Sequence, residues 1–129
     1  MAKMSDEEKA VRKIIRKTEK DMQSLGTYRP QFDSAIRVYS EMRFQYDVLM
    51  QQFYADGCKI SEEYTNKAGA KNIRKTAMYL SLETLRKDIV NHENLLGLTP
   101  AGLKRINDEM AKKKKKMSKL DLALSSLDK

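Results

Sequence analysis

Residues that could carry out catalysis are scarce in this chain. It has one histidine, His92, and one cysteine, Cys58. Nucleophilic catalysis pairs a nucleophile with a base, and a zinc site takes several ligands, most often histidine and cysteine. The HExxH, CxxC and GxSxG patterns and a glycine-rich phosphate loop are all absent from the sequence. We therefore expect a protein that is not an enzyme and that uses no metal and no cofactor.

Basic side chains are the chemical groups that do show a pattern. Lysine and arginine number 26 against 18 aspartate and glutamate, which gives a net charge of +8. Residues 97–129 hold nine of the basic and four of the acidic side chains, so they supply +5 of this total. Such an excess favours a polyanionic partner such as nucleic acid. Three clusters are candidates for contacts with DNA phosphates: Lys9, Arg12, Lys13, Arg16, Lys17 and Lys20; Lys104 and Arg105; and Lys112, Lys113, Lys114, Lys115 and Lys116.

The first and third of these clusters are expected to supply most of the phosphate affinity. Spacings of three and four place most of the first cluster along one stripe of a helix. The third is a run of identical point charges, which suits phosphates but has no pattern for reading bases. The alternative is that all three clusters are ordinary solvated helix faces.

The elements that position these clusters are predicted to be helices. The first is opened by a capping box formed by Ser5 and Glu8 and is closed by Gly26. A second helix over 30–56 and a third that starts near Thr76 each carry an apolar heptad stripe. Such stripes need an antiparallel partner helix, a neighbouring subunit, or both. The side chains expected at oligomer contacts are Phe32, Tyr39, Met42, Tyr46, Leu49, Phe53, Leu82, Leu85 and Ile89.

A sharp corner is predicted after the third helix, in the stretch "LLGLTPAGLKRI". Gly97 suits the position that follows a helix, Thr99 suits an N-cap, and Pro100 suits the first position of the next helix. This is a helix-turn-helix in the geometric sense, and many such corners have no role in DNA binding. His92 lies within the apolar stripe of the third helix, so we interpret it as structural.

The sequence as a whole predicts an all-α fold, a long antiparallel helical hairpin flanked by shorter helices. Residues 58–73 have no helical period and predict a loop or one short β-hairpin. Three regions follow: a basic N-terminal helix (1–26), a helical-hairpin core (27–111), and a lysine run with a C-terminal amphipathic tail (112–129).

The amphipathic tail is expected to dock on a protein partner, because it is too short to be a stable helix alone. Its apolar face is formed by Leu120, Leu124 and Leu127. No apolar run approaches the roughly 18 residues of a membrane span, and no signal peptide is recognisable. We therefore expect no membrane partner. A single cysteine is typical of a reducing, cytosolic protein.

Three stretches in order resemble a known family: "NKAGAKN", "LETLRKDI" and "LGLTPAGLKRI". At this spacing they are similar to the small subunit of phage DNA-packaging terminase, in the branch common among long-tailed phages. The resemblance runs from about Tyr54 to Met110. The first helix and the lysine run lie outside it, and Thr76 stands where a proline is expected near the start of the third helix.

The resemblance implies a non-catalytic protein of the host cell cytoplasm that assembles into a homo-oligomeric ring. Such a protein binds double-stranded viral DNA at the packaging-initiation region and brings it to the terminase large subunit, which holds the ATPase and nuclease. The resemblance also suggests that large subunit as the partner of the C-terminal tail. The alternative is a small helical coiled-coil adaptor or scaffold that binds other proteins.

Overall fold

The computed structural model describes residues 3–127. The chain forms, in order, α1 (Asp6–Leu25), a 3₁₀ turn (Pro30–Phe32), α2 (Asp33–Ala55), β1 (Ser61–Thr65), β2 (Lys71–Lys75), α3 (Ala77–Leu95) and α4 (Pro100–Leu127). The predicted helical fold with one short β-hairpin is therefore confirmed. The ends of the first and last predicted regions, residues 1–2 and 128–129, lie outside the described residues.

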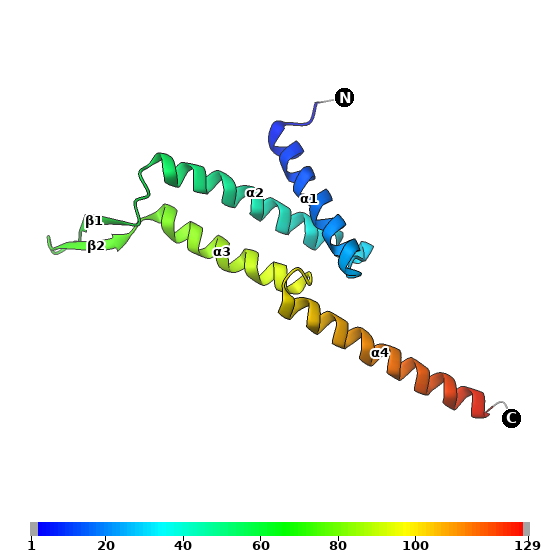
Figure 1. Cartoon of the computed structure of the whole chain (residues 1–129). Helices are drawn as coiled ribbons and strands as arrows, with labels where there is room; N and C mark the ends of the chain where they lie inside the picture. The colour runs from blue at the N-terminus through cyan, green and yellow to red at the C-terminus, as the bar shows by residue number, and fades with distance from the viewer. Residues whose placement is uncertain (1–2, 128–129) are drawn as a thin grey trace.

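The elements are arranged as an extended molecule around the antiparallel pair α2 and α3 (Figure 1). α1 packs across the first half of α2. The hairpin β1–β2 projects from one end of the helix pair, and α4 leads away from the other end. Both projections leave the body of the protein, so most of their side chains face solvent.

A small core lies where α1, the first half of α2 and the last half of α3 meet. It is formed by Met22, Ile36, Tyr39, Ile89 and Leu96, all buried. Burial of such apolar side chains is the main stabilising contribution to the fold. Phe53 and Leu82 are also buried, closer to the hairpin end of the helix pair.

The ends of the first helix follow the sequence signals. The Ser5 hydroxyl accepts a hydrogen bond from the Glu8 amide at 3.2 Å. At the other end Gly26 has φ 74°, and the Thr27 amide donates to the Met22 carbonyl at 2.9 Å. These contacts satisfy terminal backbone groups that the helix itself leaves unpaired.

The contact face of α2 is wider than the predicted heptad stripe. Ile36 and Ser40, which are not among the residues predicted for that stripe, are fully buried. The reason is that α1 and α3 both pack on α2, so two stripes are covered instead of one. Ser40 is accommodated because its hydroxyl donates to the Ile36 carbonyl at 2.7 Å.

α4 is a single helix of 28 residues, about 42 Å long at 1.5 Å per residue. The predicted boundary between residues 111 and 112 falls inside it. Every residue from Asn107 to Leu127 is exposed.

Within the described part of the chain, no helix is long and apolar enough to cross a membrane.

Tyr39 gives the core a pH dependence. Burial, followed by the nearby Glu93 carboxylate, raises the pKa of Tyr39 from 10.0 to about 12. The unfolded chain therefore loses this proton first. The stabilisation is complete below about pH 10 and is lost as pH rises through 12.

We expect the free energy of unfolding in urea to fall more steeply for the wild type than for Tyr39→Phe as pH rises above 10. Tyrosinate absorbance at 295 nm reports the titration directly. Parallel curves for the two proteins would show that Tyr39 ionises equally in the folded and unfolded states.

Candidate nucleic-acid interface

The corner between α3 and α4 has the caps that its sequence predicts. Gly97 adopts φ 75°, and the Leu98 amide donates to the Glu93 carbonyl at 2.9 Å. The Thr99 hydroxyl accepts from the Gly102 amide at 3.1 Å, which caps the start of α4. These contacts set the direction in which α4 leaves the body.

Gly102 and Arg105 fix the same corner from the α4 side. Gly102 is buried against the backbone of Asn94. The Arg105 Nη2 donates to the carbonyls of Asn94 and Leu95 at 3.2 and 3.4 Å, and its Nη1 lies 3.5 Å from the Glu109 carboxylate. A guanidinium is well suited to the unpaired carbonyls at a helix C-terminus. Arg105 therefore holds the corner, and Lys104 is the member of this cluster that faces solvent without an ion pair among the described residues.

Most of the basic cluster of α1 lies on the side away from α2, whereas Arg12 and Lys17 lie at the edges of the α1–α2 contact. All six side chains are exposed. Lys17 lies 3.0 Å from the Asp21 carboxylate, an exposed i,i+4 pair that contributes little to stability. Among the described residues the other five make no ion pair within 4.0 Å: Lys9, Arg12, Lys13, Arg16 and Lys20.

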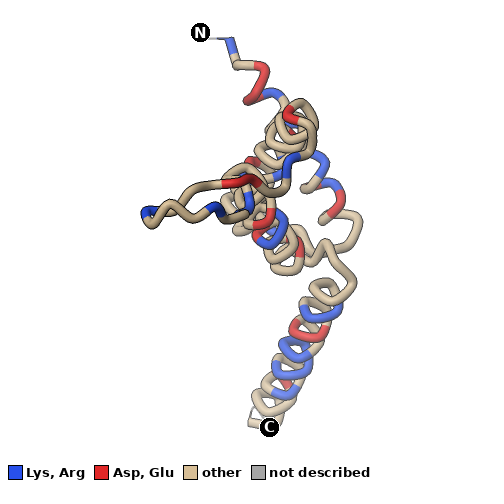
Figure 2. Tube along the Cα trace, turned by 90° about the vertical axis from the view of Figure 1, so that its left-hand side faces the viewer, with Lys and Arg blue, Asp and Glu red and all other residues tan. Residues whose placement is uncertain are grey.

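The lysine run, Lys112–Lys116, lies on the part of α4 that projects into solvent (Figure 2). Successive residues of a helix are rotated by about 100°, so five in a row surround the helix axis. None of the five lies within 4.0 Å of a carboxylate in the described part of the chain. Their charges are therefore available to an external polyanion.

The β-hairpin carries a fourth basic group that sequence reasoning missed. Lys67 and Lys71 are exposed at its tip and have no ion pair among residues 3–127. The lysines were not recognised because uncharged residues separate them. The strand register, which pairs Thr65 with Lys71, brings them to the same end.

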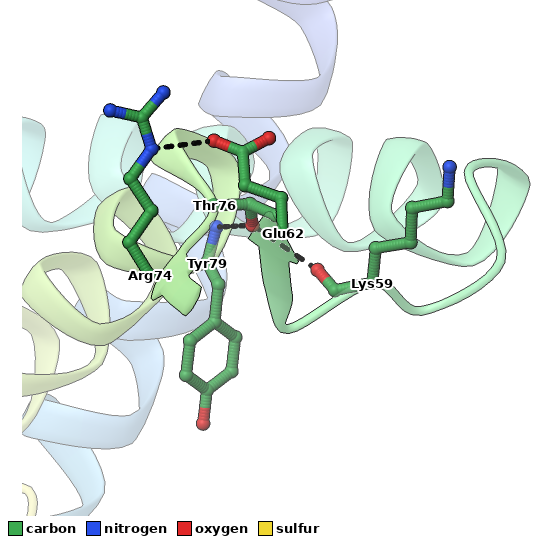
Figure 3. Close-up of polar contacts among 5 residues, drawn as sticks. All are labelled: Lys59, Glu62, Arg74, Thr76 and Tyr79. Atoms are coloured by element: carbon green, nitrogen blue, oxygen red, sulfur yellow. Dashed lines mark hydrogen bonds and ion pairs between the residues drawn. The ribbon is translucent and has the colours of Figure 1, made fainter. Parts of the chain in front are cut away.

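The base of the hairpin is fixed by Thr76 (Figure 3). Its hydroxyl donates to the Lys59 carbonyl and accepts from the Tyr79 amide, both at 3.1 Å, and so caps α3. Its own amide donates to the Ile60 carbonyl at 2.9 Å. A proline has neither the hydroxyl nor the amide hydrogen, so Thr76 makes contacts that the proline of the resembled family could not make.

A pair of side chains across the strands also supports the hairpin. Arg74 Nε lies 3.1 Å from the Glu62 carboxylate on the facing strand, and the guanidinium lies 4.5 Å from the centre of the Tyr64 ring. Opposite charges and cation–π contacts across a two-stranded ribbon each add a modest stabilisation. The hairpin therefore keeps its shape without being covered.

The side chains expected at oligomer contacts divide into two groups. Tyr39, Phe53, Leu82 and Ile89 are buried within the chain itself. The remaining five are partly exposed: Phe32, Met42, Tyr46, Leu49 and Leu85. Two of these, Leu49 and Leu85, line an apolar surface groove of about 250 Å³ between α2 and α3.

The tail residues Leu120, Leu124 and Leu127 are 60%, 53% and 78% exposed. They lie on the last part of α4, away from the body of the protein. No segment among the described residues covers them.

His92 and Cys58, the one histidine and the one cysteine of the chain, lie in different parts of the protein. His92 Nδ1 donates to the Asp88 carbonyl at 2.8 Å, a local contact within α3. Cys58 is exposed after the end of α2. Among residues 3–127, no three His, Cys, Asp or Glu side chains are placed to hold a metal ion.

The structure does not gather the basic clusters into one site within a single chain. The α1 cluster, the hairpin tip and the lysine run lie on three different parts of the molecule (Figure 2). Lys104 and the lysine run share α4.

No protein-family model, curated protein or solved structure matches this chain.

Proposed function

We propose that this chain is the non-catalytic small subunit of a viral DNA-packaging terminase. In this role it forms a homo-oligomer in the host cell cytoplasm, binds double-stranded DNA at the packaging-initiation region, and delivers it to the large subunit. The support is the resemblance of residues 54–110 together with the exposed basic clusters. The resemblance suggests the viral setting, and the basic clusters could bind the phosphates of DNA.

The observation that carries the proposal is the lysine run on α4. Five consecutive exposed lysines without a carboxylate partner among the described residues repel one another. A duplex relieves this repulsion, because its phosphates lie about 1.7 Å apart along the axis and release counterions when lysines approach. The affinity gained in this way is independent of base sequence.

An oligomer would bring the separated clusters of several chains together around one duplex. Each chain contributes a few weak phosphate contacts, and linking them raises the overall affinity through the effective concentration. In this way a chain whose basic clusters lie on separate elements could still bind DNA tightly. The groove beside Leu49 and Leu85 is the surface on α2 and α3 that we assign to subunit contacts.

The proposal is tested by measuring DNA binding over a series of salt concentrations. A gel shift with packaging-region DNA should show an affinity that falls linearly with salt on a double-logarithmic plot, with a slope of about −0.9 per phosphate contact. Native mass spectrometry of the same protein should show a homo-oligomer. A stable monomer with no measurable DNA binding at low salt would contradict the proposal.

A protein adaptor is the second candidate, and the exposed apolar residues of α4 favour it. Association through apolar surface depends weakly on salt, whereas phosphate binding depends on it steeply. The slope of the salt series therefore separates the two functions.

A further inference from the structure

α4 carries one continuous apolar stripe, which is longer than the tail predicted from the sequence. Its members alternate spacings of three and four, the a and d positions of a heptad repeat. They are Leu103, Ile106, Met110, Met117, Leu120, Leu124 and Leu127, with Lys113 at the one polar position. The stripe therefore has a coiled-coil period over the whole helix.

Only the beginning of this stripe is covered by the chain itself. Leu103 and Ile106 are partly buried at the corner, where Ile106 lies against Gly97. Beyond them Met117 is 64% exposed and Leu127 is 78% exposed. A helix that leaves its own core with an uncovered apolar stripe lacks the packing that normally stabilises helices.

The charges that flank the stripe are complementary to those of a second copy of this chain. In a parallel pair of helices, each g position lies beside the e position five residues later on the partner. Glu109 then faces Lys114 of the second copy, and Lys116 faces Asp121. Both combinations are of opposite charge, and two-fold symmetry repeats each of them.

Pairing within one helix accounts for Glu109, which lies 3.5 Å from Arg105, but not for Asp121. Side chains five residues apart on a helix are not neighbours, since neighbours are three or four apart. Asp121 is the only acidic residue between Met110 and Leu127, and it has no basic residue three or four positions away. Its position is explained by a partner helix that presents Lys116.

We propose that α4 forms a parallel, in-register coiled coil with α4 of a second copy of the chain. An antiparallel pair with its exposed stripes aligned would keep only the contact between Lys114 and Asp121. Lys113 lies in the seam, where a polar side chain lowers stability and restricts the register. Lys112 and Lys115 lie on the outside of the pair, so the coiled coil leaves them free for other contacts.

The geometry is tested by disulfide cross-linking of the full chain in a Cys58→Ser background. Leu127→Cys places a cysteine in the seam at the far end of α4, where only a parallel pair brings the two copies together. Leu122→Cys is the matched control, because Leu122 is similarly exposed at 71% but lies on the outer face. We expect the seam cysteine to cross-link at least about tenfold faster, since pairing raises its effective concentration.

Charge exchange tests the assignment of the flanking pairs. Lys116→Glu should slow the cross-linking of Leu127→Cys, and adding Asp121→Lys should restore it. Lys113→Leu should speed it, whereas Lys112→Leu, on the outer face, should not. Equal cross-linking at positions 127 and 122 would overturn the proposal.

Two further outcomes would also overturn it, and both leave DNA binding as a separate question. Cross-linking between Leu127→Cys and Met110→Cys, without any between two copies of Leu127→Cys, would show an antiparallel pair. Protection of an uncross-linked Leu127→Cys from alkylation only when the terminase large subunit is added would assign the stripe to that partner. Because these experiments contain no DNA, their failure is distinguishable from failure of the proposed function.

Discussion

Reversing the charge of Lys112 and Lys115 is expected to weaken DNA binding by roughly one to two orders of magnitude at 0.1 M salt. The slope of the salt dependence should also become shallower by about one unit for each phosphate that is no longer neutralised. Both side chains are exposed and lie on the side of α4 away from its apolar stripe. Their substitution by glutamate therefore leaves the stripe intact. Fluorescence anisotropy over a salt series measures both the affinity and the slope.

The matched control is the double variant Arg37→Glu and Lys87→Glu. It changes the net charge by the same amount on α2 and α3, where both side chains are exposed. If this control weakens binding as much as the α4 variant, the effect is one of net charge, and the lysine run has no special role.

The other clusters are compared in the same assay. Reversal of Arg12, Lys13 and Arg16 should lower both affinity and slope, because α1 presents them to solvent without ion pairs in the described chain. Lys104→Glu should have a smaller effect. The corner is tested with Lys104 alone, because Arg105→Glu would also remove the hydrogen bonds to the α3 carbonyls. Loss of binding in Lys104→Glu with no change in the α1 variant would make the corner helix the DNA reader.

Gly102→Ala is expected to lower the free energy of unfolding by about 3 kcal/mol or to displace α4 from the corner. A methyl group at this position would overlap the Asn94 carbonyl oxygen and would lie 2.9 Å from its carbonyl carbon. These are backbone atoms of α3, which cannot move aside as a flexible side chain can. Urea denaturation measures the stability, and proteolysis near residue 100 reports a displaced α4.

Gly26→Ala serves as the comparison for this prediction. Gly26 has φ 74°, but a methyl group there meets nothing within 4 Å. Its cost is the conformational one alone, about 1–2 kcal/mol. A destabilisation in Gly102→Ala no larger than that in Gly26→Ala would show that the corner opens without strain.

The helix ends were predictable from the sequence because each depends on local chemistry. Ser5, Gly26, Gly97 and Thr99 occupy the positions that their side chains or their conformational freedom favour, and the hydrogen bonds at the helix ends confirm them. Heptad spacing also identified α2 and α3 as a packed pair, but the flanking helices are not shorter as predicted, because α4 has 28 residues against 23 in α2 and 19 in α3. Each of the helix-end signals depends on residues a few positions apart along the chain, so the sequence alone is enough to recognise it.

What the sequence could not show depends on contacts between distant segments. Ile36 and Ser40 are buried because α1 lies across α2, and nothing in the local spacing indicates this packing. Arg105 was expected at a DNA surface, but its guanidinium lies over carbonyls ten and eleven residues earlier. The basic tip of the hairpin was missed because it depends on the strand register. Counting charges along the sequence does not distinguish a basic side chain that holds the fold, such as Arg105, from one that faces solvent.

The short connection at Gly97–Thr99 makes α4 a lever. The helix is about 42 Å long, so a rotation of about 10° at the corner moves its far end by about 7 Å. The hydrogen bonds of Arg105 and Thr99 therefore fix the angle of α4, and a small change of that angle produces a large displacement of Leu127. Substitutions at the corner should consequently alter the reach and spacing of the α4 ends in an assembly without touching any residue of those ends.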